Sequence, residues 1–430
     1  MSTVNILFLK KLYSPIGGSE ALTFQLATRL AAHGHRVRVL SLWPRRERYG
    51  FPPAADLALV HSTHRLYLNA GVELYQLRPR LGALGGVLDV LAPFNLLDYT
   101  VAHGLASGFD LVHVVCREYA AAGLRLARET GMAYVTTPLP HPGQAWGGAG
   151  RGDVAIYRQA DAVMALTEAE RGWYLRQGVD AERVMTVDLG PTFAGPGDGA
   201  GFRRRYGLDG PVVLFVGRKE RYKGVQALAR AASLVWRRHP GARFVFIGED
   251  SAFEWLWGTF REPLDPRILN LPVVDDATKA DAFAACDVFC LPSRHETFGL
   301  VFAEAWQCGK PVIAGDIPAG RALIADGVDG LLVRQSADDI ASAITRLLDD
   351  PALARGMGEA GRRKIATRYN WTHTIAQTEQ LYAAALARAG ALLPAAEQAG
   401  NRGQLSAARA GARGEPAGAR SYFPQLQRRD

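Results

Sequence analysis

Two glutamates separated by seven residues, Glu296 and Glu304, could contact a ligand that is rich in hydroxyl groups. They bound the stretch ETFGLVFAE, in which Glu304 stands among apolar residues. A carboxylate in such surroundings is seldom buried without a partner. Two turns up a helix, it could accept hydrogen bonds from vicinal hydroxyls such as those of ribose. Taken alone, a capping carboxylate at 296 and a surface charge at 304 are the simpler interpretation.

The turn between the two glutamates could bind an anion. We expect a helix that begins near Thr297 or Phe298 and ends near Cys308, where Gly309 is a stop signal. The first backbone N–H groups of a helix lack partners within it and point at any anion placed there. Gly299 would let that anion approach closely. The expected N–H donors are Phe298, Gly299, Leu300 and Val301.

Cations and glycines stand at two further strand-to-helix turns. Arg218 follows the apolar run PVVLFVG, and Lys223 precedes the next expected helix. Together they could neutralise a diphosphate, although solvated side chains are the usual fate of Arg and Lys. Gly17 and Gly18 occupy the first such turn, where backbone donors can meet a phosphate. A plain turn is the alternative for these glycines.

One histidine has a position that suits a ligand site. His141 lies between two prolines, in the loop that directly follows the expected strand 133–137. Ligands of open α/β sheets gather at the carboxyl ends of the strands. A structural loop histidine is the alternative.

These residues are positioned by strands that alternate with helices, a pattern typical of α/β folds with parallel sheets. Pro292 ends the buried strand before Glu296, and the strand 311–314 follows the helix. The expected strands are 4–9, 37–40, 110–115, 133–137, 162–167, 211–216, 243–248, 286–291 and 311–314. The expected helices are 18–33, 119–129, 225–238, 279–286, 298–308, 337–348, 351–369 and 372–388.

The Glu296–Glu304 stretch resembles the E-x7-E donor-site motif of retaining glycosyltransferases of family 4. The likeness continues through GKPVI at 309–313 and GVDG at 327–330. Members of that family use nucleotide sugars on a GT-B fold. The resemblance therefore implies two Rossmann-like parallel-sheet domains that face a cleft, with a C-terminal helix that crosses back to the first domain.

The resemblance also implies roles for the charged residues. Glu296 would contact the donor sugar, and Glu304 would bind the ribose. Arg218 and Lys223 match the family's diphosphate pair in order and spacing. His141 would bind the sugar or orient the acceptor.

The other expected donor contacts come from backbone and apolar positions. Gly17 and Gly18 would face the donor phosphates, and Val274 would border the base. The sequence Gly190–Phe193 departs from the Gly-Val-Asp motif that family members have near the interdomain link. The donor-binding set comprises Gly17, Gly18, Gly248, Val274, Thr297, Phe298, Gly299, Leu300 and Val301, beside the four charged residues.

At 430 residues, the chain is long enough for two domains. We expect a first, acceptor-side domain over 1–194, a linker over 195–210 and a nucleotide-sugar domain over 211–370. A crossing helix over 371–389 and a disordered basic tail over 390–430 complete the expected organisation. The tail is rich in Ala, Gly and Arg and has almost no apolar periodicity.

Composition narrows the class of protein. The formal net charge is +8, of which the tail supplies +3, and the remainder does not indicate a nucleic-acid partner. The four cysteines lack metal-ligand spacing and suit reduced thiols in the cytoplasm. We expect a strand directly at the N-terminal residues 4–9 and therefore expect no secretory signal. The basic loop 43–49 and the apolar segment 81–105 leave contact with the inner membrane surface as an alternative to solvent and core packing.

We therefore predict a retaining glycosyltransferase that moves a sugar from a nucleoside-diphosphate sugar to a hydroxyl acceptor in polysaccharide or glycoconjugate biosynthesis. The acceptor could be a glycan, a lipid or a small molecule. The chain contains no Asp-x-Asp pair, the metal-holding feature of the GT-A class. No metal and no cofactor are expected. A nucleotide-sugar-binding protein without turnover and a GT-B sugar-nucleotide epimerase are the alternatives.

Overall fold

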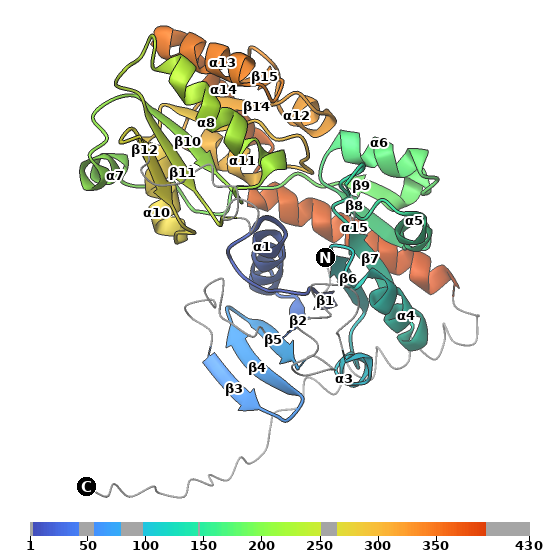
Figure 1. The fold of residues 1–430 in the computed structure, drawn as a ribbon. Coiled ribbons are helices and arrows are strands. Elements are labelled where there is room, and N and C mark those ends of the chain that lie inside the picture. Colours follow the sequence, from blue (N-terminus) through green and yellow to red (C-terminus); the bar gives the residue numbers. More distant parts are fainter. Residues whose placement is uncertain (1–2, 43–55, 79–97, 145–146, 251–264, 393–430) are drawn as a thin grey trace, which may run out of the picture.

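The described part of the chain forms two β-sheets that lie one above the other with helices packed against them (Figure 1). This computed structural model describes residues 3–42, 56–78, 98–144, 147–250 and 265–392. Both sheets are built mainly from parallel strands, as the alternation of strands and helices predicts. The GT-B expectation of two parallel-sheet domains is confirmed.

The first sheet has the strand order β3-β4-β5-β2-β1-β6-β7-β8-β9 within the described residues. The inner strands are mainly apolar, and all five residues of β6 are buried, as expected of a sheet covered on both faces. Its strands are β1 Asn5–Leu9, β2 Arg36–Leu42, β3 Asp56–Val60, β4 His64–Asn69, β5 Val72–Leu77, β6 Leu111–Val115, β7 Ala133–Thr137, β8 Ala162–Ala165 and β9 Val184–Thr186. The accompanying helices are α1 Gly18–Ala32, α3 Tyr99–Gly104, α4 Ala120–Thr130, α5 Arg151–Tyr157, α6 Glu168–Arg176 and η1 Ala181–Arg183.

The second sheet is parallel throughout and has the order β12-β11-β10-β13-β14-β15 within the described residues. Its strands are β10 Val212–Val216, β11 Arg243–Ile247, β12 Ile268–Leu271, β13 Val288–Leu291, β14 Val312–Gly315 and β15 Gly330–Val333. Its helices are α7 Gly199–Tyr206, η2 Arg221–Lys223, α8 Val225–Val235, α10 Asp276–Ala285, α11 Leu300–Gln307, α12 Pro318–Leu323, α13 Ala337–Asp349 and α14 Pro351–Thr367.

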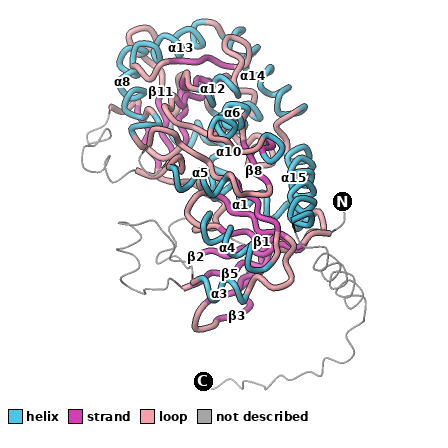
Figure 2. The backbone as a smooth tube through the Cα atoms, turned by 90° about the vertical axis from the view of Figure 1, so that its right-hand side faces the viewer, coloured by secondary structure: helices cyan, strands magenta, loops and turns pink. Residues whose placement is uncertain are grey.

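The last helix, α15 Trp371–Leu392, leaves the second sheet and packs on the first, against β7, β8 and α1 (Figure 2). The Tyr382 hydroxyl lies 2.8 Å from Nδ1 of His113 on β6. Farther along the helix, Arg388 donates a 3.0 Å hydrogen bond to the carbonyl oxygen of Asp161. The expected crossing helix is present. It runs beyond residue 389, so residues 390–392 are helical and do not belong to the predicted tail.

Some elements of the structure were not predicted. Strands β3, β4 and β5 were not expected, and β9 is a further unexpected strand, which pairs with the outer edge of β8. The expected linker 195–210 contains the helix α7, which packs against α10. A Cβ atom at Gly199 would lie 2.6 Å from the backbone of Ala284, so this glycine permits the close approach of the two helices.

Several sequence-based expectations fall outside the described residues. These are the basic loop 43–49, most of the apolar segment 81–105 and the tail from 393 onward. Of the helices that the structure does describe, none is both long enough and apolar enough for a membrane span. The residue boundaries of the two domains stay a prediction.

Candidate active site

The two residues expected at the diphosphate and the sugar form an ion pair with each other. Lys223 lies at the end of η2, and Glu296 lies in the turn after β13. The Lys223 ammonium donates to Oε1 of Glu296, and the Ser293 hydroxyl donates to the same oxygen at 3.1 Å. Both side chains are largely buried, at 16% and 10% exposed. Lys223 and Glu296, which the sequence predicts at one site, therefore lie in contact, and Ser293 is a neighbour that was not predicted.

Arg218 stands at the carboxyl end of β10, beside this pair but more open to solvent. Its guanidinium donates to the Tyr222 hydroxyl at 3.0 Å and pairs with Glu220 at 3.1 Å. The side chain is 61% exposed, so a ligand could reach it. Tyr222 is a second neighbour that the sequence did not single out.

The helix after Glu296 begins later than predicted. Helix α11 starts at Leu300 because Gly299 has a left-handed conformation, with φ of 79°. A Cβ atom there would lie 2.7 Å from the Phe302 ring, so the position requires glycine. Phe298 is buried with its ring 5.5 Å from that of Tyr369, which leaves only its backbone for a ligand. Thr297 and Val301 are half-buried in the same turn and first helical turn.

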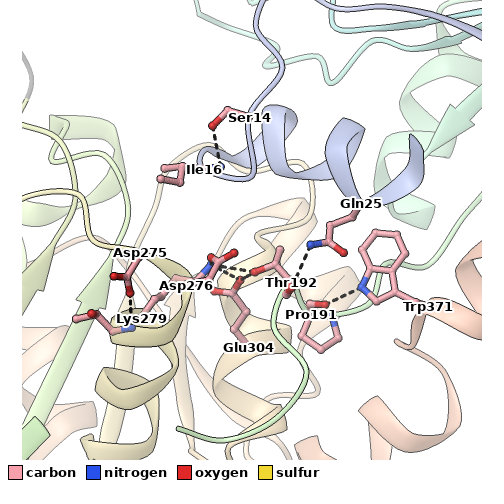
Figure 3. Close-up of polar contacts among 11 residues, drawn as sticks. Ser14, Ile16, Gln25, Pro191, Thr192, Asp275, Asp276, Lys279, Glu304 and Trp371 are labelled. Atoms are coloured by element: carbon pink, nitrogen blue, oxygen red, sulfur yellow. Dashed lines mark hydrogen bonds and ion pairs between the residues drawn. The ribbon is translucent and has the colours of Figure 1, made fainter. Parts of the chain in front are cut away.

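Glu304 is buried, and its two carboxylate oxygens differ in their surroundings (Figure 3). Oε1 accepts hydrogen bonds from the Thr192 hydroxyl and, at 3.0 Å, from the Lys279 ammonium. Oε2 is equally inaccessible to solvent and has no hydrogen-bond partner among the described residues. A buried carboxylate oxygen without a partner is energetically costly, so a ligand hydroxyl would fit there.

Gly17 and Gly18 lie at the amino-terminal end of α1, in the strand-to-helix turn that the sequence predicts. Gly17 has φ of 105°, and the Glu20 carboxylate folds back so closely that a Cβ atom at 17 would lie 2.6 Å from it. Lys10 is buried next to this turn, 2.9 Å from the Ser19 hydroxyl and 3.3 Å from Glu20. Burial favours a raised pKa for Glu20, but the charge of Lys10 and the hydrogen bonds to the carboxylate together outweigh it, and the pKa is lowered.

His141 reaches from the first sheet to the Glu296 turn of the second. Its ring lies 6.4 Å from that of His295 and nearly perpendicular to it. Burial lowers the pKa of His141 to about 4, with Glu296 opposing and Lys223 adding to the shift. The imidazole is therefore neutral at pH 7 and faces the charged cluster of the second sheet.

Gly248 and Val274 lie at the carboxyl ends of the neighbouring strands β11 and β12. The Gly248 amide donates a 3.2 Å hydrogen bond to the Leu271 carbonyl oxygen. A Cβ atom at Gly248 would lie 2.0 Å from the carbonyl oxygen of Gly217, so backbone packing alone accounts for this glycine. Val274 is half-buried against the core. Contact of either residue with a nucleotide stays a prediction.

Sequence reasoning missed five polar residues of this region, namely Lys10, Thr192, Tyr222, Lys279 and Ser293. Lys10 immediately follows β1, so its place at a strand end was the available signal. The segment that contains Thr192 was noted only as a departure from the family pattern. Lys279 lies 25 residues before Glu304, and no local spacing connects them. Within the described residues, no three His, Cys, Asp or Glu side chains gather in a way that could hold a metal ion.

Two family models match the chain, one over each sheet. Residues 17–190 match the family model described as a glycosyl transferase 4-like domain, and residues 210–350 match glycosyl transferases group 1. The chain is 34% identical over 406 residues to a D-inositol 3-phosphate glycosyltransferase of Acidothermus cellulolyticus, with 86% of each chain covered. It is 30% identical over 400 residues to D-inositol 3-phosphate glycosyltransferase 2 of Catenulispora acidiphila. That match covers 85% of this chain and 90% of the Catenulispora protein.

Solved structures share the fold. Sucrose-phosphate synthase from Thermosynechococcus elongatus superposes with a TM-score of 0.71 at 23% identity, over 90% of this chain and all of that chain. Anabaena HepE in complex with UDP-glucose gives 0.68 at 20% identity, over 88% of this chain and all of that chain. The fold and the site define a GT-B glycosyltransferase. The chain belongs to the group 1 glycosyltransferase family, and the protein is an enzyme of that class.

Proposed function

We propose that this enzyme transfers a sugar, with retention of anomeric configuration, from a nucleoside-diphosphate sugar to a hydroxyl acceptor. The observation that carries the proposal is the buried Glu304, whose Oε2 has no partner among the described residues, on the helix that follows the Lys223–Glu296 pair. A ribose hydroxyl at Oε2 and a diphosphate at Lys223 would satisfy both groups. HepE has been solved with UDP-glucose bound, which supports a nucleotide sugar as donor.

The Lys223–Glu296 ion pair suggests how donor binding prepares the site. A diphosphate would attract the Lys223 ammonium away from the carboxylate, because phosphate oxygens accept charge-assisted hydrogen bonds. Glu296 would then have an oxygen free for a sugar hydroxyl, while Ser293 still holds its position. Arg218 is exposed enough to bind the same diphosphate from the other side.

The bond changes in the proposed reaction occur on one face of the sugar. The bond between the anomeric carbon and the phosphate oxygen breaks, and the acceptor oxygen bonds to the same carbon. The acceptor proton passes to the departing phosphate. Arg218, Lys223 and the N–H groups at the starts of α1 and α11 would offset the charge that develops. His141, neutral at pH 7, would orient the sugar or the acceptor hydroxyl.

The acceptor class stays broad: a hydroxyl of a glycan, a lipid or a small molecule in glycoconjugate biosynthesis. Because the relatives in Acidothermus and Catenulispora are named for inositol 3-phosphate, a phosphorylated polyol is the first acceptor to test. We place the reaction in the cytoplasm, with the inner membrane surface as the alternative location for a lipid acceptor.

A two-stage experiment tests the proposal. First, the melting temperature is measured with UDP-, GDP- and ADP-sugars, since a ligand at a hundred times its dissociation constant adds about 2.7 kcal/mol. The stabilising donor is then incubated with a panel of acceptors that includes inositol 3-phosphate, and the product anomer is assigned by NMR. Retention supports the proposal. An inverted product, or donor binding without transfer to any acceptor, would contradict it.

A further inference from the structure

The segment Gly190–Phe193, which joins the two sheets, is fixed to the first sheet through its backbone. The Thr192 carbonyl oxygen accepts a 3.1 Å hydrogen bond from the Gln25 side chain of α1. The neighbouring Pro191 carbonyl oxygen accepts a 2.6 Å hydrogen bond from the Trp371 indole at the start of α15. Thr192 is buried, so its side chain has little freedom to move away.

The Thr192 side chain contacts two helices that accompany the second sheet, α10 and α11 (Figure 3). The Lys279 ammonium lies 2.9 Å from the Thr192 hydroxyl oxygen, 3.0 Å from Oε1 of Glu304 and 2.9 Å from Asp276. An ammonium has three protons, and these three acceptors use all of them. The Thr192 hydroxyl, which accepts from Lys279, donates its own proton to Glu304.

This arrangement makes the two oxygens of Glu304 unequal. Both protein donors bind Oε1, which leaves Oε2 without a partner among the described residues. Burial opposes the charged form of Lys279, but Glu304 and then Asp276 outweigh it and raise the pKa of the lysine. The Lys279 ammonium therefore stays charged at neutral pH beside the Glu304 carboxylate. A carboxylate that is held through one oxygen can accept hydrogen bonds from a ligand through the other.

We propose that Lys279 and Thr192 are positioning residues for the donor, which hold Glu304 by Oε1 so that Oε2 meets the ribose hydroxyls. The inference rests on the proposed role of Glu304 and adds to it two residues outside the E-x7-E motif. Thr192 lies in the segment between the sheets. The Glu304 carboxylate therefore keeps this position only while the segment keeps its hydrogen bonds to Gln25 and Trp371.

This positioning is tested by how strongly the enzyme prefers a nucleotide with ribose over one whose sugar lacks the 2′ and 3′ hydroxyls. The dissociation constants of UDP, GDP and ADP, and of their 2′,3′-dideoxy counterparts, are measured by calorimetry, and the ratio is taken for the best-bound base. The wild-type enzyme should prefer the ribose form by about ten- to a hundredfold, since hydrogen bonds to a charged group are strong. Glu304→Gln should reduce this ratio to within a few-fold of one.

The variants of the positioning residues should act on the same ratio. Thr192→Val removes the hydroxyl at nearly constant volume and should lower the ratio several-fold, whereas Thr192→Ser should restore it. Lys279→Met should lower the ratio towards that of Glu304→Gln. Lys364→Met is the matched control, because the Lys364 ammonium pairs with the buried Asp329 and lies over the Trp306 ring of α11, and it does not hold the Glu304 carboxylate. It should change the melting temperature and keep the wild-type ratio.

The outcomes separate this inference from the proposed function. If Glu304→Gln keeps the wild-type ratio, the ribose role of Glu304 itself is wrong. If Glu304→Gln abolishes the preference while Thr192→Val and Lys279→Met retain it, the donor role stands and the positioning proposal is overturned. If Lys279→Met does not fold, the Thr192→Val and Thr192→Ser pair decides, because neither variant removes a charge.

Discussion

At the scale of single residues, the site contains an ion pair, one partner of which a ligand could replace, and a buried carboxylate to which a ligand could bind. Lys223 and Glu296 are paired, and Glu304 is bonded through one oxygen only among the described residues. The sequence predicted these residue types and their meeting at strand ends. It could not predict Thr192 and Lys279 as neighbours of Glu304, because those contacts join positions that are 112 and 25 residues apart.

Replacement of His141 should separate catalysis from binding. His141→Ala should lower kcat by at least about tenfold and change the dissociation constant of the nucleoside diphosphate by less than about threefold. A side chain directed at the reacting sugar acts mainly in the transition state. Steady-state kinetics and calorimetry on the same preparation measure both quantities. Equal losses in affinity and kcat, or a poorly folded variant, would instead indicate a structural histidine.

The pH dependence of the folding stability should depend on the lowered pKa of His141. The pKa of His141 is about 4 in the folded protein, below its ordinary value of 6.5. Between these values only the unfolded chain binds the proton, so lowering the pH from 6.5 to 4 favours unfolding. In chemical denaturation, the wild type should therefore lose more stability over this window than His141→Gln. Equal losses in the two proteins would show that the folded-state pKa is not depressed.

At the scale of elements, apolar runs and helix signals predicted most strands and helices near the site. The errors have physical reasons. Strand β3 lies at the edge of the first sheet with its residues exposed, and most residues of the neighbouring β4 are only half-buried, so neither has the buried apolar run that marks an inner strand. Helix α7 begins in the glycine-rich stretch GPGDGAG, whose composition favours a linker, whereas Gly197 and Gly199 allow close packing on α10.

The start of α11 can be tested through Gly299. Gly299→Ala should destabilise the fold by about 1–3 kcal/mol, since alanine is strained at φ of 79° and its Cβ atom would lie 2.7 Å from Phe302. Gly327→Ala is the control, because Gly327 has φ of 76° and a Cβ atom there would meet no described residue within 4 Å. Urea denaturation should show the larger loss for Gly299→Ala. A smaller loss than for Gly327→Ala would show that Phe302 does not restrict this turn.

At the scale of the whole molecule, the two sheets are joined twice, by the Gly190–Phe193 segment and by α15. The crossing helix was predicted because the resemblance of the chain to the glycosyltransferase family implies the whole fold. The contacts that anchor this helix on the first sheet were not predicted. Tyr382 and Arg388 provide these contacts on the first sheet. Contacts between the sheets depend on their relative placement, which no local sequence pattern encodes.

Truncation should separate α15 from the tail. A chain that ends after Gly390 retains Tyr382 and Arg388, so it should keep the wild-type melting temperature and its turnover on a soluble acceptor. A chain that ends after Leu381 loses both anchors and should melt several degrees lower. Thermal denaturation of the two truncated proteins makes the comparison. A large loss for the longer protein would show that the tail contributes to the fold.

We propose that fixed protein charges, rather than a metal ion, stabilise the departing diphosphate during sugar transfer. Lys223 is the cation paired at the site, and Arg218 lies beside it. Preorganised charges need no ion to assemble.

This proposal is tested by turnover of the stabilising nucleotide sugar, measured with and without EDTA in the wild type and in Lys223→Ala. We expect EDTA to leave wild-type turnover nearly unchanged. We also expect Lys223→Ala to lower kcat by orders of magnitude, without rescue by magnesium. Loss of wild-type activity in EDTA, with recovery on addition of magnesium or manganese, would contradict the proposal.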